Sequence, residues 1–191
     1  MSTTAAPNGM RPMNLIGGRP FAGSTRQIKI TDDYATAIFY GDAVSIVAGG
    51  TIEKDVGTDA MTPVGIFMGC SYTDPSLNYK LFNQQWPAGT VASDAFAYVC
   101  DDPDALFRIQ ADGQVAQTAI GANFALIQTA GSTATGNSAN ALASATAATT
   151  NTLPVRLVDF WQGPNSAIND AFTDCVVKWA AGHAYTTNEG I

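Results

Sequence analysis

The sequence is poor in charge and has no long apolar run. Charged residues make up 13% of its 191 residues, whereas typical soluble domains contain about 25%. No stretch approaches the roughly 18 consecutive apolar residues of a membrane-spanning helix, and the first residues lack the apolar core of a secretory signal. We therefore expect no membrane partner. A charge-poor surface uses Ser, Thr, Asn and Gln for solubility or is covered by partner molecules, and we favour partner contact.

Catalytic motifs are also missing. The one histidine, His183, lies in a Gly/Ala/Tyr stretch, and no G-x-S-x-G nucleophile motif is present. No P-loop, G-x-G-x-x-G or H-E-x-x-H motif occurs either. We therefore expect a non-enzymatic protein with no cofactor. An enzyme that draws scattered aspartates together from distant strands stays open as an alternative.

Metal-binding patterns are absent from the cysteines and aspartates. Cys70, Cys100 and Cys175 lie far apart and show no zinc-ligand spacing. Each lies in an apolar stretch, so we expect small hydrophobic residues of a chain made in a reducing cytoplasm. The aspartates of 101–104 (DDPD) surround a proline and lack the ligand spacing of a calcium loop. This segment therefore predicts a turn in which Asp side chains cap backbone amides.

Charge is unevenly distributed along the chain. Residues 1–31 contain Arg11, Arg19, Arg26 and Lys29 and no acidic residue, whereas the other 160 residues contain five basic and sixteen acidic ones. The net charge of −7 argues against a nucleic-acid partner. A basic arm on an acidic body indicates a segment that contacts a partner, and these four residues are our candidate contact residues. The alternative is an arm that folds back on its own acidic body.

Short runs rich in Ile, Val, Phe and Tyr follow one another between Gly, Asp and Pro. The predicted strands are 26–30, 36–40, 43–47, 51–54, 64–69, 90–100, 105–110, 123–128, 154–161 and 174–181. Their number and spacing predict a mainly β fold, either an antiparallel β-sandwich or a small β-barrel. Residues 1–25, rich in Pro and Gly, predict an extended N-terminal arm. Residues 26–191 predict a single β-rich domain.

Two segments of this domain are distinctive. Residues 40–55 (YGDAVSIVAGGTIEKD) predict a hairpin with its turn at 48–50, because glycines accept positive φ. Alternation places Val44 and Ile46 on one face of it. Residues 113–155 contain no charged residue, and 129–152 consist almost wholly of Ala, Thr, Ser, Asn and Gly. We expect 129–152 to be an insertion that lies on a neighbouring subunit or forms a mobile surface loop.

Several stretches resemble one class of structural protein. These are GDAVSIVAGGTIEKD followed by PVGIFMGCSY (41–72), WPAGTV (86–91), DDPDALFRIQADG (101–113) and LPVRLVDFW (153–161). Together they are similar to the capsid decoration, or cement, proteins of tailed bacteriophages. The resemblance covers roughly residues 26–191 and carries no catalytic residue.

The resemblance implies a β-rich virion protein on the outside of the capsid. It would bind the major capsid protein as a homo-oligomer, with a trimer favoured, and stabilise the head by bridging neighbouring capsid subunits. The four basic residues would then contact capsid or a sister subunit, and a low-charge surface suits such closely fitted contacts. The alternative is a tail-fibre or carbohydrate-binding β module, which would need exposed aromatic residues in a groove.

Overall fold

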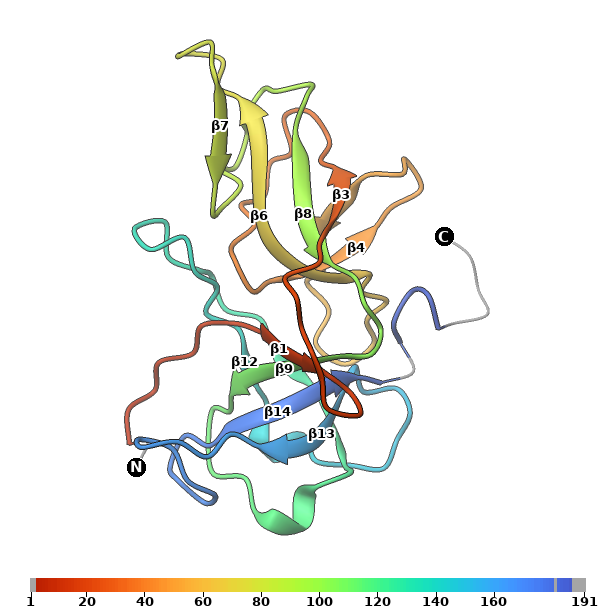
Figure 1. The fold of residues 1–191 in the computed structure, drawn as a ribbon, viewed down its shortest axis with the longest axis vertical. Helices are drawn as coiled ribbons and strands as arrows, with labels where there is room; N and C mark the ends of the chain where they lie inside the picture. Colours follow the sequence, from red (N-terminus) through yellow and green to blue (C-terminus); the bar gives the residue numbers. More distant parts are fainter. Residues whose placement is uncertain (1–2, 181, 187–191) are drawn as a thin grey trace.

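A computed structural model describes residues 3–180 and 182–186, and these form the mainly β, antiparallel fold that the sequence predicts. Sheet A contains six strands in the order β10-β13-β14-β9-β1-β2. These strands are β1 (Arg11–Leu15), β2 (Arg19–Pro20), β9 (Ala105–Gln110), β10 (Asn123–Phe124), β13 (Val155–Phe160) and β14 (Asp174–Trp179). Sheet A takes up the lower half of the molecule in Figure 1.

Sheet B, in the upper half of Figure 1, contains the other long strands. Its order is β3-β8-β6-β4-β5, and β7 also pairs with β6. These strands are β3 (Arg26–Lys29), β4 (Ala43–Ile46), β5 (Ile52–Lys54), β6 (Gly65–Thr73), β7 (Lys80–Asn83) and β8 (Phe96–Cys100). In the described part of the chain the sheets form no closed barrel. Of the two predicted architectures, the arrangement is therefore consistent with the β-sandwich.

The remaining elements are short. Strands β11 (Leu126–Ile127) and β12 (Ala141–Leu142) form a separate pair. The helices are two single 3-10 turns, η1 (Gln117–Ala119) and η2 (Ser144–Thr146). In the described ranges no helix is long and apolar enough to cross a membrane. Secondary structure therefore contributes little outside the two sheets, and loops with many hydrogen bonds connect them.

Each sheet has its own apolar core, and the two cores meet at one end of β6. Phe107, Phe124 and Leu157 are completely buried in the sheet A core, whereas Phe67 and Trp86 are completely buried in the sheet B core. Ile66 on β6 and Cys100 on β8 belong to sheet B by pairing but pack in the sheet A core. Strand β8 also continues directly into β9 through residues 101–104. The two halves are therefore connected by packing as well as by the chain.

The N-terminal segment differs from the predicted arm. Strand β1 lies between β9 and β2 in sheet A, and Met10 is only 1% exposed in the core of that sheet. Further contacts join the Met10 amide to the Gly41 carbonyl (3.0 Å) and the Ile16 amide to the Asp104 carbonyl (2.9 Å). The proline and glycine content indicated an irregular arm, but tertiary pairing with β9 makes residues 11–15 a strand of the sheet.

The hairpin of residues 40–55 forms as predicted. Strands β4 and β5 pair with Ser45 opposite Glu53 and Ile46 opposite Ile52, and Gly50 in the turn has a φ of +72°. The preceding segment, 36–40, was predicted as a strand but makes only isolated bridges, from Ile38 to Trp86 and from Tyr40 to Asn137. The chain turns at residues 39–42, where the Asp42 side chain accepts the Phe39 amide, and this turn ends any regular pairing.

The charge-free segment is part of the body and not an insertion that lies outside it. Within 129–152, Leu142 is completely buried, and Ser138 and Asn140 are each 2% exposed. The Ser138 amide donates to the Tyr40 carbonyl (3.0 Å), and the Tyr40 amide donates to the Gly136 carbonyl (3.0 Å). The small polar side chains, which indicated a loop in the sequence, bond backbone groups and each other inside the protein.

His183 is packed against aromatic residues, and its burial should make the stability of the folded protein depend on pH. It is 1% exposed, its Nδ1 accepts the Tyr185 amide, and its ring centroid lies 6.5 Å from that of Trp179. Burial lowers the pKa of His183, while the nearby carboxylates of Asp101 and Asp102 act in the opposite direction. A histidine with a lowered folded-state pKa is protonated more readily in the unfolded chain, so stability falls as the pH drops below about 6.5.

We therefore expect the free energy of unfolding to decrease between pH 7.5 and pH 5.5, by at most about 1.4 kcal/mol per pH unit. Urea unfolding at closely spaced pH values measures this slope. The matched variant is His183→Gln, which has no titrating group at this position and should show a flat profile in the same range. An equal slope in the variant would contradict the assignment to His183.

Candidate binding surface

The solvent-facing side of sheet B carries a row of residues across four strands. Ser71 on β6 lies opposite Phe82 on β7 and opposite Phe96 on β8, and Phe96 lies opposite Lys29 on β3. Directly paired residues of an antiparallel sheet project from the same face. Phe82 is 75% exposed and Phe96 is 36% exposed. Tyr98, two residues beyond Phe96, lies on the same face, and its hydroxyl is 3.3 Å from the Ser71 hydroxyl.

A groove of about 500 Å³ lies beside this row. Its walls include Arg11, Tyr40, Phe82, Gln84 and Tyr98. The floor lies at a β-bulge between Phe67 and Cys70, where Gly69 has a φ of +132°. A Cβ at Gly69 would lie 3.0 Å from the Asn83 carbonyl oxygen, so glycine is required there both for its backbone conformation and for space. The bulge locally bends β6 where the groove forms.

Arg11 and Asn137 hold one wall of the groove. The Arg11 guanidinium lies 4.1 Å from the centroid of the Tyr40 ring, a cation–π distance. Arg11 Nη2 donates to Asn137 Oδ1 (2.8 Å), and Gln84 Nε2 donates to the same oxygen (2.6 Å). Burial lowers the pKa of Arg11. Three segments that are distant in sequence, around residues 11, 84 and 137, therefore meet at one amide oxygen.

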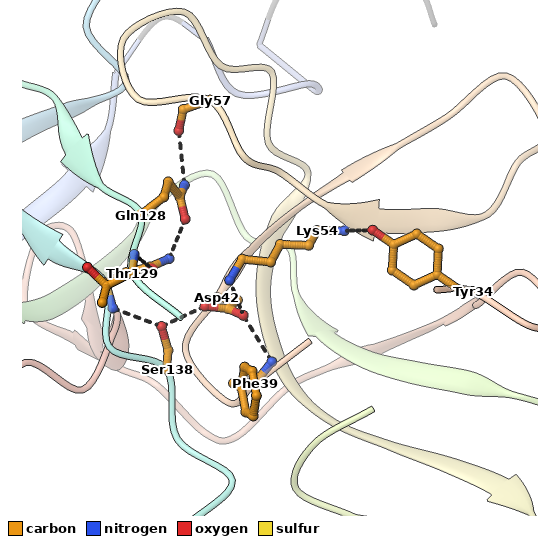
Figure 2. A network of polar contacts seen from close by, with 9 residues as sticks. Tyr34, Phe39, Asp42, Lys54, Gly57, Gln128, Thr129 and Ser138 are labelled. Carbon is orange, nitrogen blue, oxygen red and sulfur yellow. Dashed lines mark hydrogen bonds and ion pairs between the residues drawn. The ribbon is translucent and has the colours of Figure 1, made fainter. Parts of the chain in front are cut away.

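A buried ion pair fixes the turn that carries Tyr40. Asp42 is completely buried, and its Oδ2 lies 3.0 Å from Lys54 Nζ, whose side chain is 9% exposed. The same carboxylate accepts the Phe39 amide (2.9 Å) and the Ser138 hydroxyl (2.6 Å). Figure 2 shows Asp42 at the centre of these contacts. Asp42 is thus joined both to Lys54 on β5, the second strand of the hairpin, and to Ser138 in the charge-free segment.

The network continues through side-chain amides. Ser138 Oγ accepts the Asn140 amide (3.1 Å), and Asn140 Oδ1 accepts the Thr129 amide (3.0 Å). Asn140 Nδ2 donates to Gln128 Oε1 (2.7 Å), and Gln128 Nε2 donates to the Gly57 carbonyl (3.0 Å), as Figure 2 shows. Fully bonded polar networks of this kind specify a single arrangement of the segments that they join. The network therefore sets the position of Asn137 in the groove wall.

The structure separates the four basic candidate residues. Arg19 Nη2 lies 3.5 Å from Asp104, and Arg26 Nε lies 2.7 Å from Asp101, so both bind the turn of 101–104. Arg26 also lies 5.1 Å from the centroid of the Tyr185 ring. Arg11 lies in the groove, and Lys29 is exposed on β3. Arg19 and Arg26 therefore fold back on the acidic body, which is the alternative that the charge distribution left open.

The cysteines and the aspartates of 101–104, which could in principle react or bind metal, have structural roles here. All three cysteines are free and buried, and burial raises the pKa of Cys70 to about 12 and that of Cys100 to about 11. Such thiols are inert at neutral pH. The Asp102 carboxylate accepts the Asp104 amide (2.8 Å), which confirms the predicted capping role in the turn. Within residues 3–180 and 182–186, no group of three or more His, Cys, Asp or Glu residues could hold a metal ion.

Phe82, the most exposed aromatic residue of this surface, was missed in the sequence because β7 was missed. The run Lys80–Asn83 alternates in exposure, with Leu81 packed against the core and Phe82 outside. That alternation was the available signal for a strand with an exposed aromatic residue. Asn137 gave no signal, because its position depends on contacts with residues 11 and 84. Comparisons with protein-family models, curated proteins and solved structures found no match.

Proposed function

We propose that this chain is a structural protein of the virion that binds the outer surface of a tailed-phage capsid and bridges neighbouring capsid subunits. The observation that carries the proposal is the aromatic face of sheet B, where Phe82 and Phe96 are exposed on a rigid sheet. Aromatic residues are enriched at the centres of protein interfaces, where charge is scarce. The resemblance of the hairpin and its neighbouring segments to decoration proteins supports the choice of a capsid as the partner.

Further apolar residues are exposed close to Phe82 in the sequence. Leu77 and Tyr79, in the turn that precedes β7, are each 54% exposed. Large exposed apolar patches on soluble proteins often mark interaction sites. A homotrimer, which the resemblance favours, would present three such faces at once. Several weak contacts to one lattice would then add through effective concentration.

Replacing Phe82 with serine should weaken binding to capsids by at least about tenfold, because a buried aromatic residue at an interface contributes about 2 kcal/mol or more. Co-sedimentation of the full chain with purified phage heads that lack it measures the affinity. Val56→Ser is the matched control, since Val56 is 70% exposed and does not line the groove. Equal affinities for the Phe82→Ser variant and the native chain would contradict this face as the contact.

Copy number gives an independent test of the capsid role. Quantitative peptide mass spectrometry of purified particles should find this chain in numbers comparable to the major capsid protein. A few copies per particle would instead place the chain in the tail or fibres.

The groove favours a second candidate, a carbohydrate-binding module of the virion. Tyr40 and Tyr98 beside the amides of Asn83 and Gln84 combine aromatic faces with hydrogen-bonding groups, as ligand sites do. A glycan array distinguishes the two functions. A specific glycan that is bound by the native chain, together with no binding to phage heads, would replace the capsid proposal with this one.

A further inference from the structure

Arg11 differs from most other basic residues of the chain because no carboxylate of the described residues forms an ion pair with it. Six of the nine basic residues form ion pairs within the described structure. These are Arg19, Arg26, Lys54, Lys80, Arg108 and Lys178. Arg11 is half-buried in the groove, and its contacts are the Tyr40 ring and the neutral amide of Asn137. A partly desolvated charge without a counter-ion is unfavourable, so the groove has an electrostatic preference for an anion.

The geometry of Arg11 also suits a carboxylate. A guanidinium carries five N–H donors in a planar fork, and one of its nitrogens, Nη2, is held by Asn137. The contact with the Tyr40 ring and the hydrogen bond to Asn137 restrain the Arg11 side chain, which reduces the conformational entropy lost when a ligand binds. Planar, preorganised guanidinium groups bind carboxylates in two parallel hydrogen bonds. The hydrogen bond to Asn137 occupies one nitrogen and leaves the other donors of the fork for such a ligand.

We infer that the groove binds an aspartate or glutamate side chain of a protein partner, with Arg11 as the anchor. A protein partner fits better than an acidic sugar because exposed apolar and aromatic residues on β7 and in the turn before it accompany the groove. Phe82 at the rim is 75% exposed, and Leu77 and Tyr79 lie in the adjoining turn. Strand β7 pairs only with β6 among the described strands, so its outer edge can also accept an extended segment.

This inference rests on the proposed function only for the origin of the partner, and it can be tested without phage heads. The probe is the peptide acetyl-Thr-Val-Asp-Val-Thr-amide, and its twin has Asn in place of Asp. Each is titrated into the full-length, isotope-labelled chain and followed by NMR. We expect the Asp peptide to shift the signals of Tyr40, Gly69 and Gln84 and to bind at least about fivefold more tightly than the Asn peptide.

Arg11→Gln should remove the difference between the two peptides, and Arg11→Lys should retain part of it, since Lys keeps the charge but not the fork. The matched control is Arg156→Gln. Arg156 is outside any described ion pair and donates to the Asn123 amide oxygen (2.9 Å), much as Arg11 does to Asn137, yet it does not line the groove. Arg156→Gln should leave the peptide preference unchanged. Thermal unfolding of each variant shows that it is folded.

Equal affinities of the native chain for the two peptides would overturn the inference, as would signal shifts confined to other surfaces. Sodium glucuronate, a sugar carboxylate, is titrated in parallel. Binding of glucuronate without binding of the Asp peptide would overturn the choice of a protein partner. A chain that discriminates between the peptides but does not bind phage heads would contradict the capsid role and leave the Arg11 inference standing.

Discussion

Deletion of residues 1–25 is expected to destabilise the whole protein and not only to remove a contact arm. The deletion removes β1 and β2 from sheet A, so that β9 becomes an edge strand with unpaired backbone groups. It also removes Met10 from the core. Loss of a buried methionine side chain alone costs about 2–5 kcal/mol. For a chain of this size we expect the melting temperature to fall by about 10–20 °C.

Differential scanning calorimetry of the native chain and the 26–191 fragment measures this effect. The control is deletion of residues 2–5, which retains the hydrogen bond from the Ala6 amide to Gln110 Oε1 (2.7 Å) and should lower the melting temperature by only a few degrees. A 26–191 fragment with the melting temperature of the native chain would contradict the role of β1. Weaker capsid binding by the fragment would be informative only if the fragment remained folded.

Replacement of Lys54 with methionine is expected to cost about 3–5 kcal/mol, since it leaves the buried carboxylate of Asp42 without its counter-ion. Methionine keeps most of the apolar volume of the lysine stem, so the loss reports mainly on the charge. The contacts of Asp42 with Phe39 and Ser138 remain but cannot replace an ammonium group. Urea unfolding at pH 7 measures the free energy of unfolding.

Two comparisons isolate the effect of burial. The pair of Lys80 and Asp94 has nearly the same length, 2.9 Å, but its side chains are 42% and 43% exposed. Lys80→Met should therefore cost less than about 1 kcal/mol, since water screens an exposed pair. Combining Asp42→Asn with Lys54→Met should restore part of the stability that Lys54→Met loses. An equal loss for the two lysine variants would show that burial does not determine the contribution of the pair at Asp42.

Local patterns predicted the parts of the fold that depend on neighbouring residues. The hairpin of β4 and β5 was predictable because alternation, a glycine turn and β-branched residues agree within 16 residues. The strand β1 was not, since the Pro12 and Gly17–Gly18 region has weak β propensity and becomes a strand by pairing with β9, far along the chain. The same holds for 129–152, whose small polar side chains are bonded within the protein.

The candidate surface was predictable to a smaller extent. The uneven charge directed attention to Arg11, Arg19, Arg26 and Lys29, and one of these lies in the groove. Composition could not separate Arg11 from Arg19 and Arg26, because the difference lies in which of them reach the turn of 101–104. A sequence shows how many charges are present but not which are neutralised. That distinction requires the tertiary structure.

The crossing of three distant segments has a consequence for the order of folding. Gly9, Gly41 and Ser138 lie so close together that a Cβ at Gly9 would be 2.6 Å from both the Gly41 carbonyl oxygen and Ser138 Cβ. Residue 138 is synthesised almost a hundred residues after residue 41. Contacts between such distant positions slow folding, since long loops must close before they are formed. The charge-free segment is therefore the last part needed at this crossing. The hairpin is complete in sequence by residue 55, but it reaches its final environment only after residue 138 has been synthesised.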